Sequence, residues 1–162
     1  MTRNNLISLD RIDRRILAAL QRNSSISNQE LAEQVGLSPS PCSRRVKQLE
    51  EEGYIRGYVA RLDQEKLGLS LTAYIQVAMD KHTPERLSEF DRQVSNCPEI
   101  VECSLVTGQS ADYTLKVIVP DMQAYQEFLL QTLTQIPGVT GVQSSFVMRK
   151  VVDSTEVSLK HL

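Results

Sequence analysis

The segment Ser27–Gly53, with the sequence SNQELAEQVGLSPSPCSRRVKQLEEEG, decides the fold of the N-terminal part of the chain. Ser27 and Glu30 have the spacing of a capping box, in which each side chain accepts a hydrogen bond from the other residue's backbone amide. Gly36 stands where a helix ends in a left-handed residue. We therefore predict a short helix, a tight turn and a second helix that has Pro39 in its first turn.

The second helix of this segment is predicted to have an apolar and a polar face. Cys42, Val46 and Leu49 recur at helical spacing and are expected to face inward. A second stripe, turned by about 200° from the apolar one, carries serine and basic side chains. These side chains form either an ordinary solvated face or a surface that binds phosphates and bases. The neighbouring capped helix favours DNA, because paired helices of this kind place the second one in the major groove. The predicted DNA contacts are Ser38, Ser40, Arg44, Arg45, Lys47 and Gln48.

Flanking segments complete a small DNA-binding domain. Residues 9–23 carry an apolar stripe that predicts a third helix. Residues 54–61, YIRGYVAR, are aromatic and β-branched, so we expect a strand there, the wing of a winged helix-turn-helix. This N-terminal domain is predicted to span residues 1–62.

The charge is unevenly distributed between the two parts of the chain. The formal net charge is −2, yet residues 1–61 hold ten Lys/Arg against seven Asp/Glu, while residues 62–162 hold eight against thirteen. A basic end on an acidic remainder fits DNA contact by that end alone. There is no apolar run of membrane-helix length and no signal-peptide pattern in residues 1–5, so we expect a cytoplasmic protein with reduced cysteines.

The C-terminal part predicts an α+β domain. A polar segment, residues 63–70, is expected to be a hinge, and from Leu71 onward the apolar residues alternate with period two. The predicted order over residues 71–162 is strand, helix, strand, strand, helix, strand, the ferredoxin-like βαββαβ arrangement. Two helices cover one face of a four-stranded sheet. The other face would carry Tyr74, Gln76, Ala78, Lys116 and Ile118, and we expect a second subunit to cover it in a homodimer.

Four segments resemble the Lrp/AsnC (leucine-responsive, feast/famine) family of regulators. They are LDRIDRRILAALQRN at residues 9–23, ISNQELAEQVGLSPSPCSRRVKQLEEEGYIRGY at 26–58, VTGQSADYTLKVIVPDMQAY at 106–125 and IPGVTGVQSSFVMRKV at 136–151. The resemblance covers nearly the whole chain. It implies a winged helix-turn-helix followed by a βαββαβ domain that assembles into dimers and often octamers.

The same resemblance implies a small amino acid as effector, bound between dimers of the C-terminal domain. Residues carried over to the effector site are Thr107, Gly108, Ala111, Asp112 and Tyr113, with Gln143, Ser144 and Ser145 on the last strand. A glycine loop offers backbone groups at close range and Asp112 offers a charge for the ammonium group. This loop is one residue longer than the family's usual Gly-acid-X-Asp-Tyr pattern and lacks the early acid. A plain β-turn between two strands is the alternative for it.

Two other classes of function compete with a specific regulator. No catalytic triad, phosphate-binding glycine loop, cofactor motif or metal-ligand cluster appears in the sequence, so we do not expect an enzyme. The remaining alternative is an architectural DNA-binding protein of low sequence specificity without a small-molecule effector. Competition with unrelated DNA at fixed salt separates that protein from a specific regulator.

Overall fold

The computed structural model describes residues 9–108 and 111–162. Residues 1–5, for which no signal-peptide pattern is predicted, and two residues of the 108–113 loop lie outside this range. The chain forms two compact units. The N-terminal unit comprises the chain up to Arg61 together with Val152–Leu162, and the C-terminal unit comprises Leu62–Val151.

The N-terminal unit contains the three predicted helices, α1 (Arg11–Arg22), α2 (Asn28–Val35) and α3 (Pro39–Glu51). They enclose a small core in which Ile16, Leu31 and Cys42 are almost completely buried. Each helix contributes to this core through the apolar stripe that its sequence predicts. Because α3 packs on α1 and α2 along one side only, its other side is exposed.

The predicted wing strand is absent from this unit. Residues 54–61 follow α3 with a bend at Tyr54 and no regular secondary structure after it, and none of them belongs to a strand. A β-strand needs a neighbour to accept and donate backbone hydrogen bonds, and the described part of the unit contains no other strand. Aromatic and β-branched composition was therefore not sufficient to predict a strand at this place.

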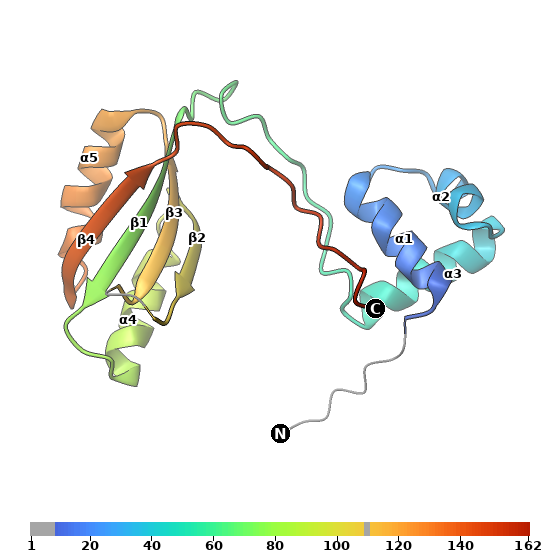
Figure 1. The fold of residues 1–162 in the computed structure, drawn as a ribbon, viewed down its shortest axis with the longest axis horizontal. Coiled ribbons are helices and arrows are strands. Elements are labelled where there is room, and N and C mark those ends of the chain that lie inside the picture. The colour runs from blue at the N-terminus through green and yellow to red at the C-terminus, as the bar shows by residue number, and fades with distance from the viewer. Residues whose placement is uncertain (1–8, 109–110) are drawn as a thin grey trace. The chain divides into compact units, whose positions relative to one another are not determined.

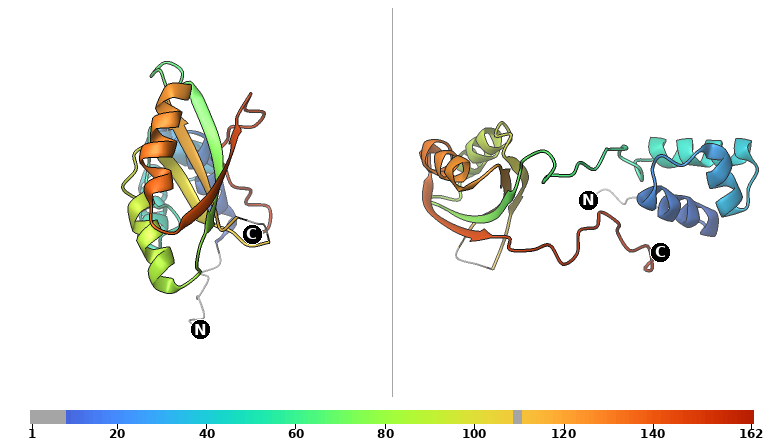
Figure 2. Two further views of the ribbon diagram at one scale, coloured as in Figure 1. Left: turned by 90° about the vertical axis from the view of Figure 1, so that its left-hand side faces the viewer. Right: turned by 90° about the horizontal axis from the view of Figure 1, so that it is seen from above.

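The C-terminal unit has the predicted βαββαβ order (Figure 1). Its elements are β1 (Leu71–Met79), α4 (Pro84–Val94), β2 (Ile100–Leu105), β3 (Tyr113–Val119), α5 (Met122–Gln131), the 3₁₀ turn η1 (Leu133–Gln135) and β4 (Val139–Phe146). The strand order is β2-β3-β1-β4 and all three pairings are antiparallel. Both long helices lie on the same face of the sheet, as Figure 2 shows. This confirms the α+β class and the βαββαβ order of the C-terminal unit.

The two faces of the sheet differ in their cover. On the helix side, Ile75, Leu115 and Val117 are completely buried among residues of α4 and α5. On the other face, Tyr74 is opposite Lys116 on β3 and Ser145 on β4, and its side chain is 42% exposed. No helix of the C-terminal unit, within its described residues, covers this open face.

The unit boundaries differ from the predicted ones at two places. Residues 63–70 belong to the C-terminal unit and hold a compact turn, in which the backbone amide of Leu69 donates to the carbonyl of Gln64 at 2.8 Å. Val152–Leu162 belong to the N-terminal unit, although the sequence places them after the last strand of the C-terminal domain. No helix in the described residues has the length and apolar character required to cross a membrane.

Candidate functional site

The helix-turn-helix is held by local hydrogen bonds at both ends of α2. The amide of Glu30 donates to Ser27 Oγ at 3.2 Å and the amide of Ser27 donates to Glu30 Oε2 at 3.0 Å, which is the predicted capping box. Gly36 ends the helix with φ of 79°, and the amide of Leu37 then donates to the carbonyl of Ala32 at 2.9 Å. These contacts fix the turn that leads into α3.

The start of α3 is joined to α2 by a side chain. Asn28 Nδ2 donates to the carbonyl of Pro39 at 2.9 Å. Ser38 occupies the N-cap position as predicted, but its side chain makes no capping hydrogen bond. The hydroxyl of Ser38 and the backbone amide of Ser40 are therefore available to an acceptor outside the helix, whereas Pro39 and Pro41 have no backbone N–H to offer.

Five of the six predicted contact residues are exposed, four on the outer face of α3 and Ser38 at its N-cap. Cys42 and Leu49 are buried on the inner face, whereas the side chains on the opposite face are exposed. The exposed predicted contacts are Ser38, Ser40, Arg44, Lys47 and Gln48. The structure thus places these side chains on one accessible surface of the N-terminal unit.

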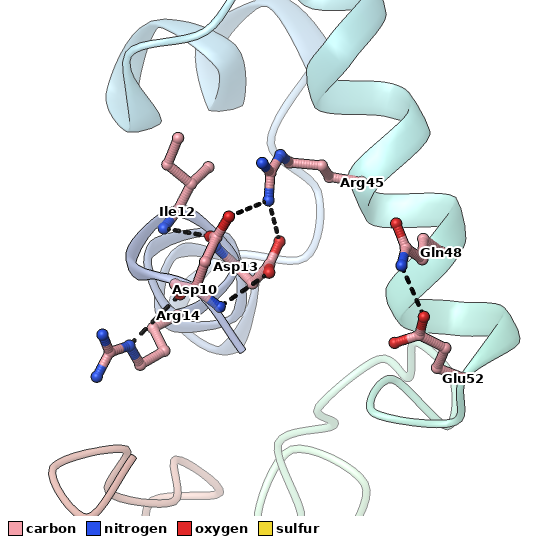
Figure 3. Close-up of polar contacts among 7 residues, drawn as sticks. All are labelled: Asp10, Ile12, Asp13, Arg14, Arg45, Gln48 and Glu52. Atoms are coloured by element: carbon pink, nitrogen blue, oxygen red, sulfur yellow. Dashed lines mark hydrogen bonds and ion pairs between the residues drawn. The ribbon is translucent and has the colours of Figure 1, made fainter. Parts of the chain in front are cut away.

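Two of the exposed side chains are paired along the helix. Lys47 Nζ lies 3.6 Å from Glu51 Oε1. Gln48 Nε2 donates to Glu52 Oε1 at 2.7 Å (Figure 3). Such exposed pairs between neighbouring turns are weak, so a phosphate or a base edge can replace them. Arg44 makes no hydrogen bond or ion pair with any other described residue.

Arg45 has a different environment from the other predicted contacts. Its Nη1 donates to Asp10 Oδ2 at 2.7 Å and to Asp13 Oδ1 at 2.8 Å, and its side chain is 34% exposed (Figure 3). Asp10 is also the N-cap of α1, where Oδ1 accepts from the amide of Ile12 at 2.7 Å and from that of Asp13 at 2.8 Å. Arg45 therefore ties the middle of α3 to the first turn of α1.

The charges of this cluster stabilise one another. The backbone amide of Asp13, followed by the guanidinium of Arg45, holds the pKa of Asp10 below its ordinary value. The hydrogen bonds to Asp13 and then to Asp10 raise the pKa of Arg45. This arrangement differs from the predicted role of Arg45 as a DNA contact. Its partners are 35 and 32 residues away in the chain, so no local pattern indicated them.

The predicted effector loop joins β2 to β3, and its residues have unlike surroundings. Thr107 and Gly108 are exposed, and Gly108 has φ of 86°. Ala111 is buried. Tyr113 is buried on the helix side of the sheet, where its hydroxyl donates to Asp91 Oδ1 on α4 at 2.8 Å. Burial, followed by the hydrogen bond to Asp91, raises the pKa of Tyr113.

Asp112, the predicted anchor for an ammonium group, already has partners within the protein. Its Oδ2 accepts from the backbone amide of Met79 at 2.7 Å, and its Oδ1 lies 2.5 Å from His82 Nε2. The amide of Met79, followed by the side chain of His82, holds the pKa of Asp112 below its ordinary value. His82, in the segment between β1 and α4, therefore contacts this loop through Asp112.

The three predicted residues of β4 point to two different faces. Gln143 and Ser145 are opposite Gln76 and Tyr74 on the open face of the sheet. Ser144 points to the helix side, where its hydroxyl contacts that of Tyr125. The structure thus separates Ser144 from the other two candidates. No group of three His, Cys, Asp or Glu side chains in the described residues is arranged to hold a metal ion.

Known proteins resemble this chain over nearly its whole length. Residues 9–56 match the model of a winged helix-turn-helix DNA-binding domain, and residues 72–157 match the Lrp/AsnC ligand binding domain. The Bkd operon transcriptional regulator of Pseudomonas aeruginosa is 45% identical over 147 residues, which are 91% of this chain and 95% of that protein. The leucine-responsive regulatory protein of Escherichia coli is 43% identical over 152 residues, 94% and 92% of the two chains.

Solved structures show the same relationship. A transcriptional regulator from Neisseria meningitidis, crystallised in complex with L-Met, superposes with a TM-score of 0.92 at 42% identity, over 95% of this chain and 99% of that chain. An AsnC family transcriptional regulator from Agrobacterium tumefaciens has a TM-score of 0.89 at 38% identity, over 94% and 99%. Two matching domain models in the same order, and relatives above 40% identity along both chains, establish that the protein belongs to the Lrp/AsnC family of transcriptional regulators.

Proposed function

We propose that this protein regulates transcription as a sequence-specific DNA-binding homodimer, with α3 as the helix that enters the major groove. The observation that carries the proposal is the exposed face of α3, where Ser40, Arg44, Lys47 and Gln48 lie opposite the buried Cys42 and Leu49, with Ser38 exposed at the N-cap. A fixed helix with cationic and hydrogen-bonding side chains on its free side has the chemistry that base edges and phosphates require.

The residues of this face have separate roles in the proposal. Arg44, exposed and without a partner among the described residues, contacts a base edge or a phosphate. Lys47 and Gln48 leave their partners Glu51 and Glu52 and bind DNA instead. The hydroxyl groups of Ser38 and Ser40, at the N-terminus of α3, contact the sugar-phosphate backbone of the DNA. Arg45 stays on Asp10 and Asp13 and orients the helix.

Competition binding at fixed salt tests this proposal against an architectural role. DNA is first selected from a random pool by the full-length protein, and its complex is then challenged with unrelated DNA. We expect the selected sequence to be bound at least about a thousand-fold more tightly than unrelated DNA. Equal affinity for both would assign the protein to the low-specificity alternative.

Assembly is proposed to occur through the C-terminal unit. The open face of its sheet presents Tyr74, and no helix in the described part of the unit covers it. A second copy that buries this face gives the two-fold symmetry with which paired recognition helices bind half-sites one helical turn apart. Association of four such dimers into an octamer extends the proposal.

A small amino acid is proposed as the effector, bound at the β2–β3 loop between dimers. The related neisserial regulator was crystallised with L-Met. In this chain Gly108, exposed with φ of 86°, offers backbone groups to a carboxylate. The ammonium group needs an acceptor besides Asp112, whose oxygens already accept from Met79 and His82.

Calorimetry with each of the twenty amino acids tests the effector role on the intact protein. We expect heat of binding from one or a few of them, abolished by Gly108→Val because a side chain strains the left-handed backbone at the loop. Gly68→Val, at a left-handed glycine outside the loop, serves as the control. No heat and no thermal shift with any amino acid would remove the sensor role and leave the DNA-binding role intact.

A further inference from the structure

The last eleven residues, Val152–Leu162, form a segment that returns to the N-terminal unit (Figure 1). We call it the C-terminal strap. Its residues Thr155, Val157, Leu159, His161 and Leu162 line a groove on this unit. The alternation from Thr155 to Leu159 is expected of an extended chain whose side chains point to opposite sides in turn, and the chain then ends in a turn at residues 159–162. The remaining walls of the groove come from α1, the residues on either side of it (Leu9 and residues 23–25) and residues 54–61, and its volume is about 1070 Å³.

A glutamine on α1 binds the backbone of the strap. Gln21 Nε2 donates to the carbonyl of Val157 at 3.3 Å, and Gln21 Oε1 accepts from the amide of Val157 at 2.7 Å. The side-chain amide thus pairs with both polar backbone groups of one residue, as a neighbouring strand would. This pairing requires the strap to be extended at Val157. It also places Val157 beside Gln21 of α1.

Opposite charges lie on the two sides of the groove. Arg22 Nε is 3.7 Å from Glu156 Oε2, and Arg61 Nη2 is 3.2 Å from Asp153 Oδ2 and 3.0 Å from the carbonyl of the same residue. Arg14 donates to the carbonyl of the last residue, Leu162. These pairs are exposed and therefore weak one by one, but they bind both ends of the strap and its centre.

Leu159 is the apolar contact of the strap. It is half-buried and packs against the core of the N-terminal unit, whereas Val157 remains 67% exposed. The strap is thus held by one apolar side chain, one glutamine and three arginines. These contacts fix the register of the strap on the N-terminal unit, and they are weak enough for the strap to dissociate from it.

The strap gives the N-terminal unit a second connection to the C-terminal unit. One connection is the chain at Arg61–Leu62 and the other is the chain at Val151–Val152, which follows β4. A unit tethered at two points samples fewer positions than a unit tethered at one. In a dimer that binds two half-sites, fewer positions mean a higher effective concentration of the second recognition helix at one particular spacing.

We propose that the C-terminal strap, bound in cis to the groove of its own N-terminal unit, sets the half-site spacing that the dimer accepts. This inference rests on the proposed DNA-binding function. Release of the strap leaves each recognition helix intact and loosens only the geometry between the two helices. Affinity for two correctly spaced half-sites then falls, while affinity for one half-site is unchanged.

The first experiment establishes where the strap binds, independently of DNA. Gln21→Cys and Val157→Cys are introduced together into the full chain with Cys97→Ser and Cys103→Ser, and treated with a short bismaleimide. We expect a cross-linked monomer on a denaturing gel. A covalent dimer would mean that α1 binds the strap of a second copy, and no cross-link would mean that the strap does not lie along α1; either result overturns the proposal.

The second experiment measures binding to one half-site and to two half-sites at a graded series of separations. Leu159→Asp, which removes the apolar contact, is expected to weaken two-site binding at the preferred spacing about ten-fold and to flatten the dependence on spacing. Ser158→Asp adds the same charge at a strap position outside the groove lining and is expected to behave like the unchanged protein.

The outcomes separate the strap from the proposed function. If Leu159→Asp keeps the spacing preference of the unchanged protein, or loses affinity for a single half-site equally, the strap does not set the spacing. If the unchanged protein itself binds no selected DNA, the proposed function fails, while the cross-linking result still reports on the strap.

Discussion

Arg45 and Arg44 are neighbours in sequence with opposite surroundings. Arg44 is exposed, whereas Arg45 is bound to two carboxylates of α1. Residue type and helical spacing predicted both as DNA contacts, because a pattern in one helix cannot reveal a partner on another. The buried positions of α3 were predictable, since burial follows from the apolar stripe of the helix itself.

Salt-dependent DNA binding distinguishes the two arginines. Arg44→Gln is expected to weaken binding roughly ten- to hundred-fold and to reduce the slope of log K against log salt by about 1 for each phosphate that the protein no longer neutralises. Arg45→Gln is expected to weaken binding with an unchanged slope and to lower the urea midpoint, because it leaves two carboxylates of α1 without their cation. A reduced slope for Arg45→Gln would show that Arg45 contacts phosphate and would refute its role on α1.

The pH dependence of stability tests the environment of Asp112. Because the pKa of this carboxyl is held below its ordinary value of 3.8, its contribution to stability is present above pH 3.8 and is lost as the pH falls through the lowered pKa. Asp112→Asn should therefore be less stable than the unchanged protein at about pH 5 to 6, and the difference should shrink as the pH falls through the ordinary and then the lowered pKa.

Urea denaturation between about pH 3 and pH 6 measures this difference, with His82→Gln as the control. The control keeps the hydrogen bond from the amide of Met79, the larger cause of the lowered pKa, so most of the pH dependence should remain. An Asp112→Asn variant as stable as the unchanged protein near neutral pH would mean that the carboxylate has no structural role in the loop.

At the scale of elements, local signals were the most informative. The capping box at Ser27, the left-handed Gly36 and the period-two pattern of β1 each predicted an element that the structure contains. The segment Tyr54–Arg61 shows the limit of such signals. Its composition favours a strand, but a strand exists only where a second segment pairs with it.

Gly138 illustrates how a turn depends on neighbouring elements. It has φ of 96°, and a Cβ there would lie 2.5 Å from Arg86 Cδ and 2.8 Å from Asp80 Oδ1. Gly138→Ala is therefore expected to cost the roughly 1–2 kcal/mol of a left-handed residue and in addition the contact between Asp80 and Arg86. Gly68→Ala, with φ of 75° and open space around it, should show the backbone cost alone.

A double-mutant cycle in thermal denaturation checks this reasoning. When Arg86→Ala removes the nearer of the two side chains, the extra cost of Gly138→Ala over Gly68→Ala should shrink, and the part due to Asp80 should remain. Additive effects of Gly138→Ala and Arg86→Ala would contradict a clash between these two positions.

At the scale of the whole molecule, the order of domains was predictable and the path of the C-terminus was not. Hydrophobic periodicity changes at Leu71, which separates helical from alternating segments. Residues 152–162 carry no such signal, because their partners are Gln21 and three arginines far away in sequence. Only the folded N-terminal unit brings these partners together.

Assembly through the open face of the sheet can be tested with a charge. Tyr74→Glu places a carboxylate opposite Lys116 on the neighbouring strand, so the subunit should still fold. Burying that pair in an interface is unfavourable, and we expect the dimer to dissociate at micromolar concentration in sedimentation velocity. Leu67→Glu, at an exposed position in the turn before β1, is the control and should remain dimeric. A stable Tyr74→Glu dimer would place the interface elsewhere.

DNA binding by a doubly substituted α3 tests the central claim most directly. The measurement is the affinity of full-length Arg44→Ala/Lys47→Ala for DNA selected by the unchanged protein, with Lys66→Ala/Lys81→Ala removing the same charge from the C-terminal unit. If α3 is the recognition helix, the first variant loses affinity at least about a hundred-fold with an unchanged sedimentation coefficient, and the second stays within about two-fold of the unchanged protein. Equal affinities for the two variants would contradict the assignment of α3 as the DNA-binding helix.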